Sequence, residues 1–287
     1  MVQRDPRQCA QAQTRWTLRT IQQSRDWLRG RSLAGVQMIL DRLHVSWKRG
    51  RAAVLSPDPH YDAKRAHIAA LCERVTAHPD RLVLVYLDEV TLERQPTVSS
   101  TWFPRGDDQP RAERSHATDT LTRVIASLDH QTGRVVFRRG SKIRIATIVQ
   151  FYEDLRAAYP LAERIYVVQD NWPVHTHPDV LVALEPQTSP FPFHRPGNWP
   201  TTPSAAAVRK WGTLALPFQI VSLPTYASWC NPIEKLWRKL RQDVTHLHRW
   251  ADTLPRLREE IDAFLMQFAT GSSDLLRYVG LSTQINS

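Results

Sequence analysis

The apolar residues in the first quarter of the chain recur at helical spacing. Between residues 33 and 43 they form one face of a helix that Ser32 can cap, and another helical stretch covers residues 16–28. A short basic segment with a glycine follows, over residues 46–51. Two helices followed by a basic segment outline a small all-α helix-turn-helix unit, which we expect over residues 1–58 as a partial DNA-binding region. A plain helical hairpin with a solvated basic face has the same pattern.

A pair of prolines within residues 56–59 marks the end of this region, because proline disfavours a continuing helix. The residues that follow predict one helix from Tyr61 to Ala77, which stops before Pro79. Residues 59–80 are therefore expected to form a linker and a helix ahead of the main domain.

From Arg81 onward, short apolar runs of strand type replace the helical pattern. The expected strands cover residues 82–87, 121–128, 134–137, 165–169 and 218–223, and the expected helices cover residues 143–159, 178–184, 231–248 and 254–268. Residues 129–133 are typical of a hairpin turn that ends in glycine. Residues 185–217 are rich in proline, serine, threonine and aromatic residues and are interpreted as a long insertion. The order predicts an α/β domain over residues 81–287, with a mixed sheet flanked by helices.

The composition adds a strong positive charge to this pattern. The 287 residues carry 38 Lys and Arg against 28 Asp and Glu, which gives a net charge of +10. Residues 1–80 hold 14 of the basic and 7 of the acidic residues, so most of the excess lies in the first part of the chain. A polyanion such as DNA is the natural partner of this charge, although a basic enzyme without such a partner has the same composition.

Other residue types narrow the class of protein. Three cysteines without a CxxC pair argue against a disulfide framework or a cysteine zinc site. No apolar stretch approaches the about 20 residues of a membrane span. The N-terminal residues lack the apolar core of a signal peptide. We therefore expect no membrane partner and a cytoplasmic protein.

Three acidic residues lie at distinctive places in the predicted elements. Asp88 ends the apolar run 82–88, Asp170 ends the run 165–170, and Glu234 lies at the start of the helix expected after residue 231. Carboxylates from distant parts of a chain can converge in this way. Converging carboxylates bind hard divalent cations, and paired cations are a common means of cutting and joining phosphodiester bonds.

Each acid also has a structural interpretation. Asp88 can be a turn residue at a strand end, and Asp170 can form an Asx-turn that leads into Pro173. Glu234 can bond the start of its helix in a capping box with Asn231, or it can form an exposed helical ion pair.

Two other site chemistries fit the sequence less well. A phosphotransferase with a DxD motif after the first strand would need its second acid one position later than Glu89. A zinc site would need further ligands at suitable spacing besides His175 and His177.

Three groups of basic residues are candidates for contacts with DNA phosphates. The first group lies in the basic segment near residue 50, and the second follows the predicted hairpin, where a solvated turn is the alternative. The third shares a helix face with Glu234. The candidates are Lys48, Arg49, Arg51, Arg138, Arg139, Lys142, Arg144, Arg238 and Arg241.

Two segments resemble the motifs of a known family. Residues 170–175 read Asp-Asn-x-x-x-His, and residues 223–237 read Leu-Pro-Thr-Tyr-Ala-Ser-Trp-Cys-Asn-Pro-Ile-Glu-Lys-Leu-Trp. Both are similar to the motifs of bacterial insertion-sequence transposases in the mariner superfamily (the IS six-thirty group). Asp88 and Glu89, followed by Thr-Trp-Phe-Pro-Arg-Gly at residues 101–106, resemble the first acidic block of that family. The resemblance covers roughly residues 35–270, and the segment 223–237 is its most specific part.

The resemblance implies a ribonuclease H-like fold and a DNA transposase that cuts and joins phosphodiester bonds at element ends. Its Asp-Asp-Glu triad would be Asp88, Asp170 and Glu234, which would bind two Mg²⁺ or Mn²⁺ ions. The residues implied to support the triad or to lie near DNA are Glu89, Asn171, His175 and Asn231.

The resemblance also implies partners and a location. The partners are double-stranded DNA, both as terminal inverted repeats and as target, and further copies of the chain in a homodimer or larger synaptic complex. The location is the bacterial cytoplasm, in association with the nucleoid.

Two features depart from the family. Asp170 and Glu234 are 64 positions apart, which exceeds the usual spacing by about the length of the 185–217 insertion. Only one helix-turn-helix unit is evident, near residues 32–51, where the family has two. A truncated or frameshift-split product, or a catalytically silent DNA-binding relative, is therefore the alternative.

Overall fold

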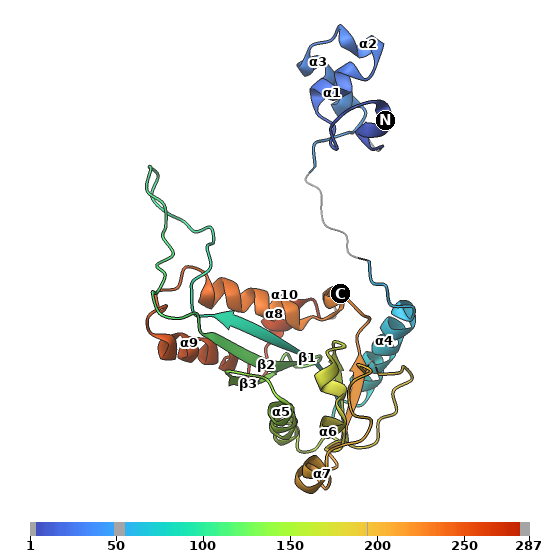
Figure 1. Cartoon of the computed structure of the whole chain (residues 1–287), viewed down its shortest axis with the longest axis vertical. Coiled ribbons are helices and arrows are strands. Elements are labelled where there is room, and N and C mark those ends of the chain that lie inside the picture. Colours follow the sequence, from blue (N-terminus) through green and yellow to red (C-terminus); the bar gives the residue numbers. More distant parts are fainter. Residues whose placement is uncertain (1–3, 49–54, 194, 282–287) are drawn as a thin grey trace. The chain divides into compact units, whose positions relative to one another are not determined.

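The structure is a computed structural model that describes residues 4–48, 55–193 and 195–281 (Figure 1). Its internal contacts divide the chain into two compact units, Met1–Val54 and Leu55–Ser287. Each unit is described separately.

The first unit is helical. Its described part holds a 3-10 turn, η1 (Pro6–Cys9), and the helices α1 (Leu18–Gln23), α2 (Asp26–Arg29) and α3 (Leu33–Arg42). Ser32 caps α3 as the sequence predicts, because its Oγ accepts a hydrogen bond from Gly35 N at 3.1 Å. Trp16, Ile21 and Val36 belong to its small buried core. Lys48 is exposed at the end of the described segment, and Arg49 and Arg51 lie outside the described residues. DNA recognition by this unit stays a prediction.

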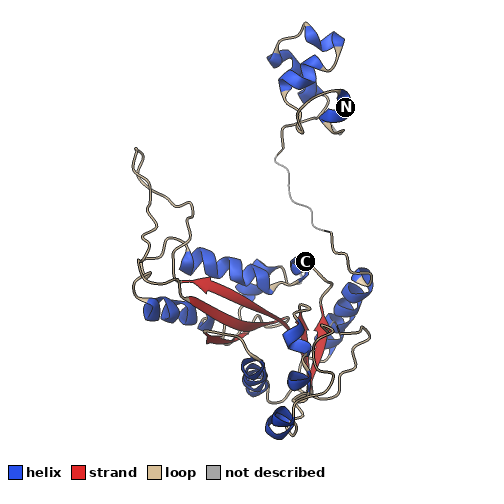
Figure 2. Cartoon of the chain, viewed as in Figure 1, coloured by secondary structure: helices blue, strands red, loops and turns tan. Residues whose placement is uncertain are grey.

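The second unit is built on a mixed sheet of five strands in the order β3-β2-β1-β4-β5 (Figure 2). The strands are β1 (Leu82–Glu93), β2 (Leu121–Asp129), β3 (Val135–Gly140), β4 (Arg164–Gln169) and β5 (Phe218–Ser222). The β1–β2 and β2–β3 pairs are antiparallel, and the β1–β4 and β4–β5 pairs are parallel. All five expected strands are present, and the predicted mixed sheet is confirmed.

Helices cover both faces of this sheet (Figure 1). One face packs against α4 (Tyr61–Ala77), α8 (Ile233–Leu240), α9 (Leu254–Met266) and α10 (Ser273–Val279). The opposite face packs against α5 (Ile145–Ala158) and α6 (Pro178–Leu181). Side chains of β1 alternate between the two cores: Leu84 and Tyr86 lie on the α8 face, and Val85 and Leu87 lie on the α5 face.

The sequence-based end of the first strand is wrong. The strand does not stop at the acid after Leu87, because β1 pairs with β2 as far as Glu93↔Leu121. Its pairing with β4 ends earlier, at Tyr86↔Val168. Asp88 and Glu89 therefore lie inside a long strand, in the part that β4 no longer flanks. In the sequence these two acids look like the end of a strand, because they replace apolar residues at the point where β4 no longer pairs with β1.

The helix expected over residues 231–248 is present, but it ends earlier than expected. Helix α8 ends at Leu240 and continues as one π-helical turn over Arg241–Thr245, after which His246 is extended. His246 forms an isolated parallel bridge with Thr97, at the start of the long β1–β2 connection. This pairing requires extended backbone at His246 and so ends the helix.

The segment 185–217 contains the short helix α7 (Ala205–Trp211) and is held against the sheet. Gln187 Nε2 donates to Phe218 O at 3.0 Å, and Gln219 Nε2 donates to Pro186 O at 2.9 Å. Leu184 and Leu216 form a parallel bridge at the base of the segment. The insertion therefore leaves and returns at nearly the same place, which lets the strands on either side of it pair directly.

The predicted hairpin turn depends on a glycine. Gly133 has φ +68°, and a Cβ at this position would lie 2.5 Å from Ser272 O. The turn is therefore packed against the segment that precedes α10. Within the described part of the chain, no helix combines the length and the apolar character required to cross a membrane.

Candidate active site

Asp88 lies on the α8 face of β1 and is half-buried. Its Oδ2 accepts a hydrogen bond from Trp237 Nε1 on α8 at 2.9 Å. Burial, together with the charges of Glu234 and Glu89, raises the pKa of Asp88 to about 7, although the Trp237 hydrogen bond opposes the change. Burial and the neighbouring acids disfavour the ionised form of Asp88, so a cation bound nearby would stabilise its carboxylate.

Asp170 follows β4 directly and is exposed. Its Oδ1 accepts a hydrogen bond from Trp172 N at 2.9 Å, so the Asx-turn considered from the sequence is present. This bond occupies one oxygen and leaves acceptor capacity on the carboxylate. The next residue, Asn171, donates from Nδ2 to Leu223 O at 2.8 Å and so ties this turn to the end of β5.

Glu234 lies in the first turn of α8. The capping box considered from the sequence is wrong, because Pro232 is the N-cap of α8 and no side chain bonds to the helix start. Asn231 instead donates from Nδ2 to Leu87 O at 3.1 Å, which fixes the beginning of the helix against β1. Desolvation and the charge of Asp170 raise the pKa of Glu234, and Arg241 and Arg238 act in the opposite direction.

A pocket of about 380 Å³ opens beside Glu234. Its lining combines this one acid with two arginines, an aromatic ring and polar groups from Ser228, Trp229, Glu234, Arg238, Arg241, Gln242 and His246. Both arginines line the pocket together with Glu234, and their charges act on its carboxylate. Such a lining suits a phosphate group next to a carboxylate.

Glu89 and His175 meet on the opposite face of the sheet. His175 is fully buried, and its Nε2 lies 3.4 Å from Glu89 Oε1 and 3.7 Å from Asp170 Oδ1. Burial alone lowers the pKa of His175, but the carboxylates of Glu89, Asp170 and Asp88 raise it above its ordinary value. His175 therefore links Asp170 on one strand to the acid beside Asp88 on the next strand.

Close contacts link the elements that carry the predicted acids. Trp237 of α8 donates to Asp88 of β1, and His175 lies 3.4 Å from Glu89 and 3.7 Å from Asp170. The assignment of the acids as one catalytic group stays a prediction. Trp237 was not identified from the sequence as a donor to Asp88, although a buried indole N–H needs a partner and was a usable signal.

The chemistry of this group fits a divalent cation. No described Lys or Arg side chain lies within 4.0 Å of these carboxylates, and His175 is their closest basic partner. Glu89 Oε1 and Asn231 Oδ1 are buried without hydrogen-bond partners, a state that is rare for polar groups in native proteins. Among the described residues, no three potential ligands are already gathered at metal-binding distance.

His177 does not belong to this group. Its Nδ1 accepts from Asp179 N at 3.1 Å and caps α6, and its ring lies against Trp199 with 5.0 Å between ring centroids. The residue therefore has a local structural role.

The four basic residues after the hairpin differ in their contacts: Arg138 and Arg139 form ion pairs with helices, whereas Lys142 and Arg144 are exposed. Arg138 makes a two-point contact with Asp154 of α5 at 2.8 and 2.9 Å, and Arg139 makes one with Asp262 of α9. These pairs attach β3 to helices on the two faces of the sheet. Lys142 and Arg144 are exposed, and they remain the better candidates for phosphate contacts in this cluster.

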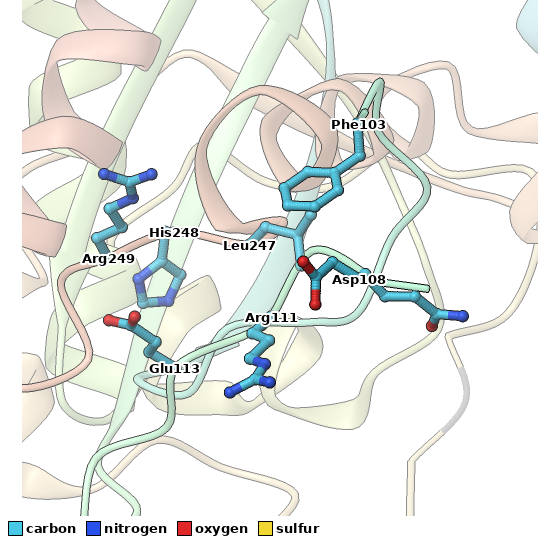
Figure 3. Close-up of a pocket in the computed structure, with 8 residues that line it drawn as sticks. Phe103, Asp108, Arg111, Glu113, Leu247, His248 and Arg249 are labelled. Atoms are coloured by element: carbon cyan, nitrogen blue, oxygen red, sulfur yellow. The ribbon is translucent and has the colours of Figure 1, made fainter. Parts of the chain in front are cut away.

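A second pocket, of about 360 Å³, lies at the base of the β1–β2 connection (Figure 3). Figure 1 shows this connection projecting from the sheet. The lining holds side chains of both charges, Asp108 and Glu113 together with Arg111 and Arg249. None of the predicted triad residues lines this pocket, so it is separate from the carboxylate group.

Comparisons with known proteins place the fold and the family. The chain is 24% identical over 206 residues to an insertion element IS630 uncharacterized 39 kDa protein from Shigella sonnei, which covers 71% of this chain and 50% of that protein. The chain therefore spans about half the length of this curated relative.

Solved structures of the Mos1 transposase are similar in fold. A Mos1 mariner paired-end complex with Mn superimposes with a TM-score of 0.56 at 16% identity, over 92% of this chain and 70% of that one. A Mos1 paired-end complex with left transposon end gives a TM-score of 0.54 at 15% identity, over 90% and 69%. The ribonuclease H-like fold and the family resemblance expected from the sequence are confirmed. The sequence pattern described as DDE superfamily endonuclease matches residues 83–258, which include Asp88, Asp170 and Glu234, and the chain belongs to this family.

Proposed function

We propose that this protein is a DNA transposase whose catalytic triad is Asp88, Asp170 and Glu234. The observation that carries the proposal is the placement of these acids on adjoining elements. The parallel register of β1 and β4 brings Asp88 level with Asp170, and the α8 helix that carries Glu234 bonds to Asp88 through Trp237 at 2.9 Å. The reaction is the cutting and joining of phosphodiester bonds at the ends of a mobile element. Membership of the DDE endonuclease family supports this reaction class.

The three carboxylates would hold two Mg²⁺ or Mn²⁺ ions. Bound ions would supply the positive charge that activates a water or a DNA 3′-hydroxyl and stabilises the leaving oxygen. The Trp237 indole fixes the orientation of Asp88, and Asn231 fixes the start of the helix that carries Glu234. Mos1 was crystallised with Mn and with Mg, which supports this choice of ions.

The remaining predicted residues support the triad or bind DNA. Glu89 and His175 hold the opposite side of the site, and His175 lies close enough to Asp170 to orient its carboxylate. Arg238 and Arg241 line the pocket beside Glu234, where they would contact the phosphates that flank the scissile bond.

The proposed partners are double-stranded DNA, as terminal inverted repeats and as target, and a second copy of the chain. Two element ends must be paired for transposition, which favours a homodimer or a larger synaptic complex. The Mos1 structures are paired-end and strand-transfer complexes, and they support this arrangement by similarity. The chain matches only 50% of its curated relative, so we propose these partners for the chain and do not transfer them from that protein.

The test is Mn²⁺-dependent nicking of supercoiled DNA by the purified protein and by Glu234→Gln. This change removes the charge and keeps the shape of the side chain. Glu73→Gln, at an exposed position on α4, is the matched control for loss of one carboxylate. Nicking by the wild type and by Glu73→Gln, but not by Glu234→Gln, is expected. Equal nicking by all three proteins would remove Glu234 from the triad.

A second candidate is a catalytically silent DNA-binding relative. The 64 positions between Asp170 and Glu234 exceed the spacing that the family resemblance implies, which favours this alternative. If the wild type binds DNA and does not nick it at any Mn²⁺ concentration, the silent relative is the correct function.

A further inference from the structure

Asp58 and Lys64 form the most deeply buried pair of a basic side chain and a carboxylate among the described residues. Their side chains are 3% and 8% exposed, and Lys64 Nζ lies 2.8 Å from Asp58 Oδ2. Both lie at the start of the second unit, in the residues that lead into α4 and in its first turn. A buried ion pair is weak evidence for stability, because the desolvation of two charges offsets their attraction. Its partners therefore decide what it does.

Besides a local bond from His60 N to Asp58 Oδ1 and the position of Lys64 Nζ 5.9 Å from the centre of the Phe191 ring, the side-chain hydrogen bonds of this pair reach one loop 159 or more residues further along the chain. Asp58 Oδ2 accepts from Thr225 N at 2.8 Å and from Thr225 Oγ1 at 3.2 Å, and Lys64 Nζ donates to Leu223 O at 3.5 Å. Ser56 Oγ adds a hydrogen bond to Thr225 O at 2.6 Å. Both backbone polar groups and the hydroxyl of Thr225 are thus bonded to residues 56–58.

The same loop is bonded to the residue beside the second acid. Asn171 Nδ2 donates to Leu223 O at 2.8 Å and lies 3.4 Å from Thr225 Oγ1. Asn171 directly follows Asp170. Leu223 O therefore accepts hydrogen bonds from Lys64 and from Asn171. The buried pair reaches the Asp170 turn through this shared carbonyl and through the Thr225 hydroxyl, which lies between Asp58 and Asn171.

The other end of the loop delivers the third acid. After Thr225 the backbone passes through Tyr226 in a left-handed conformation, with φ +54°, which a side chain larger than glycine rarely adopts. It then reaches Asn231, which is bonded to Leu87 O, and Glu234 in the first turn of α8. The loop is thus fixed at Thr225 by Asp58 and at Asn231 by β1, and the strained residue lies between these two attachments.

We propose that Asp58 and Lys64 are positioning residues for the metal-binding carboxylates: by fixing Thr225 and Leu223 they set the relative placement of Glu234 and Asp170. The inference rests on the proposed function. Neither residue touches the acids, so they act through the loop. An apolar pair of the same size would fill the space, but it would not supply the directional bonds to Thr225 N and Oγ1. The orientation of metal ligands by such outer contacts typically changes metal affinity by about 10- to 100-fold.

The experiment measures Mn²⁺ binding by titration calorimetry on the full chain without DNA, together with the melting temperature of each variant. Thr225→Val removes only the hydroxyl that joins Asp58 to Asn171 and keeps the size of the side chain. Asp58→Asn removes the charge and leaves Lys64 without its partner. Leu155→Ala is the control, because Leu155 is buried on the α5 face and has no part in the loop network.

The proposal expects Mn²⁺ binding about tenfold weaker or more in Thr225→Val, and weaker still in Asp58→Asn where that variant is folded. Leu155→Ala should melt at a lower temperature and bind Mn²⁺ as the wild type does. Unchanged Mn²⁺ affinity in a folded Thr225→Val protein would overturn the proposal, as would an equal loss of affinity in Leu155→Ala.

These outcomes separate the positioning role from the proposed function. If the wild type binds Mn²⁺ through Glu234 but does not nick DNA, the transposase proposal fails, and the positioning role is still decided by the calorimetric affinities. If the wild type does not bind Mn²⁺ at all, both proposals are overturned.

Discussion

The hydrogen bond from Trp237 to Asp88 gives the most specific prediction about the site. Trp237 is 1% exposed, and its Nε1 donates to Asp88 Oδ2 at 2.9 Å. Trp237→Phe keeps an aromatic ring in the core and removes this donor. A hydrogen bond to a charged group contributes about 1.5–3 kcal/mol, which corresponds to about 10- to 150-fold in an equilibrium constant. The ionised, correctly oriented Asp88 should lose this stabilisation.

We expect Mn²⁺ affinity to fall by about 10- to 100-fold in Trp237→Phe, the range typical for loss of an outer hydrogen bond to a metal ligand. Titration calorimetry measures the affinity, and nicking of supercoiled DNA at low and at saturating Mn²⁺ shows whether added metal restores the rate. Trp16→Phe is the matched control, because it removes a hydrogen bond of the same kind, from Nε1 to Arg4 O at 2.9 Å, in the first unit.

The reasoning would be refuted by a folded Trp237→Phe protein that binds Mn²⁺ and nicks DNA like Trp16→Phe. In that case the indole N–H only satisfies a buried acceptor, and the orientation of Asp88 is set by the strand alone. A lower melting temperature without a change in Mn²⁺ affinity would lead to the same conclusion, because the smaller ring leaves a cavity in the core.

Three further predictions concern other parts of the molecule. Asp88→Ala and Asp170→Ala should each abolish nicking and leave non-specific DNA binding in a filter assay intact, and residual cleavage would exclude that residue from the triad. Arg238→Ala and Arg241→Ala should each weaken DNA binding for all sequences and reduce the slope of log affinity against log salt by about 1, and an unchanged slope would place them away from phosphates. Burial raises the pKa of Asp58, but its hydrogen-bond donors outweigh this effect and hold the pKa well below its usual value. Stability from ionised Asp58 is full above its unfolded pKa of about 3.9 and is lost progressively as the pH falls towards the folded pKa. The difference in urea unfolding between wild type and Asp58→Asn should therefore be constant above about pH 4 and shrink steadily as the pH is lowered below it.

The strands of the main domain could be predicted because each is a short apolar run in a sheet covered on both faces. Runs such as 165–169 and 218–223 are buried from both sides, so their sequences carry no polar alternation and stand out clearly. The end of β1 was missed because the strand changes after Leu87 from continuously buried residues to alternating buried and exposed ones. Beyond Leu87, only Val90 and Leu92 are fully buried, and this alternation was the available signal for a strand with one covered side.

The acids of the site could be predicted from the sequence, and their supports could not. Asp170 and Glu234 follow or begin elements whose direction is set by local pattern, so their positions follow from the order of strands and helices. The bond between Asp58 and Thr225 joins residues 167 apart, and no local periodicity relates them. Such contacts depend on how the linker end of the second unit packs beside β5, which only the folded structure specifies.

The topology explains why these acids meet at one place. β1 and β4 are parallel neighbours, and the register that pairs Tyr86 with Val168 brings Asp88 level with Asp170. The side chains of adjacent residues on a strand point to opposite faces, so Asp88 faces α8 and Glu89 faces His175. The ends of parallel strands in an open sheet are where ligands bind, and the loop after β5 brings Glu234 to the same edge. With four carboxylates and one close histidine, a DNA phosphate would be repelled from this edge unless cations first occupied it, whereas Arg238 and Arg241 beside it carry no such restriction. Under the proposed function, metal binding and productive DNA binding would therefore be linked through charge, with the two sets of residues acting in different steps.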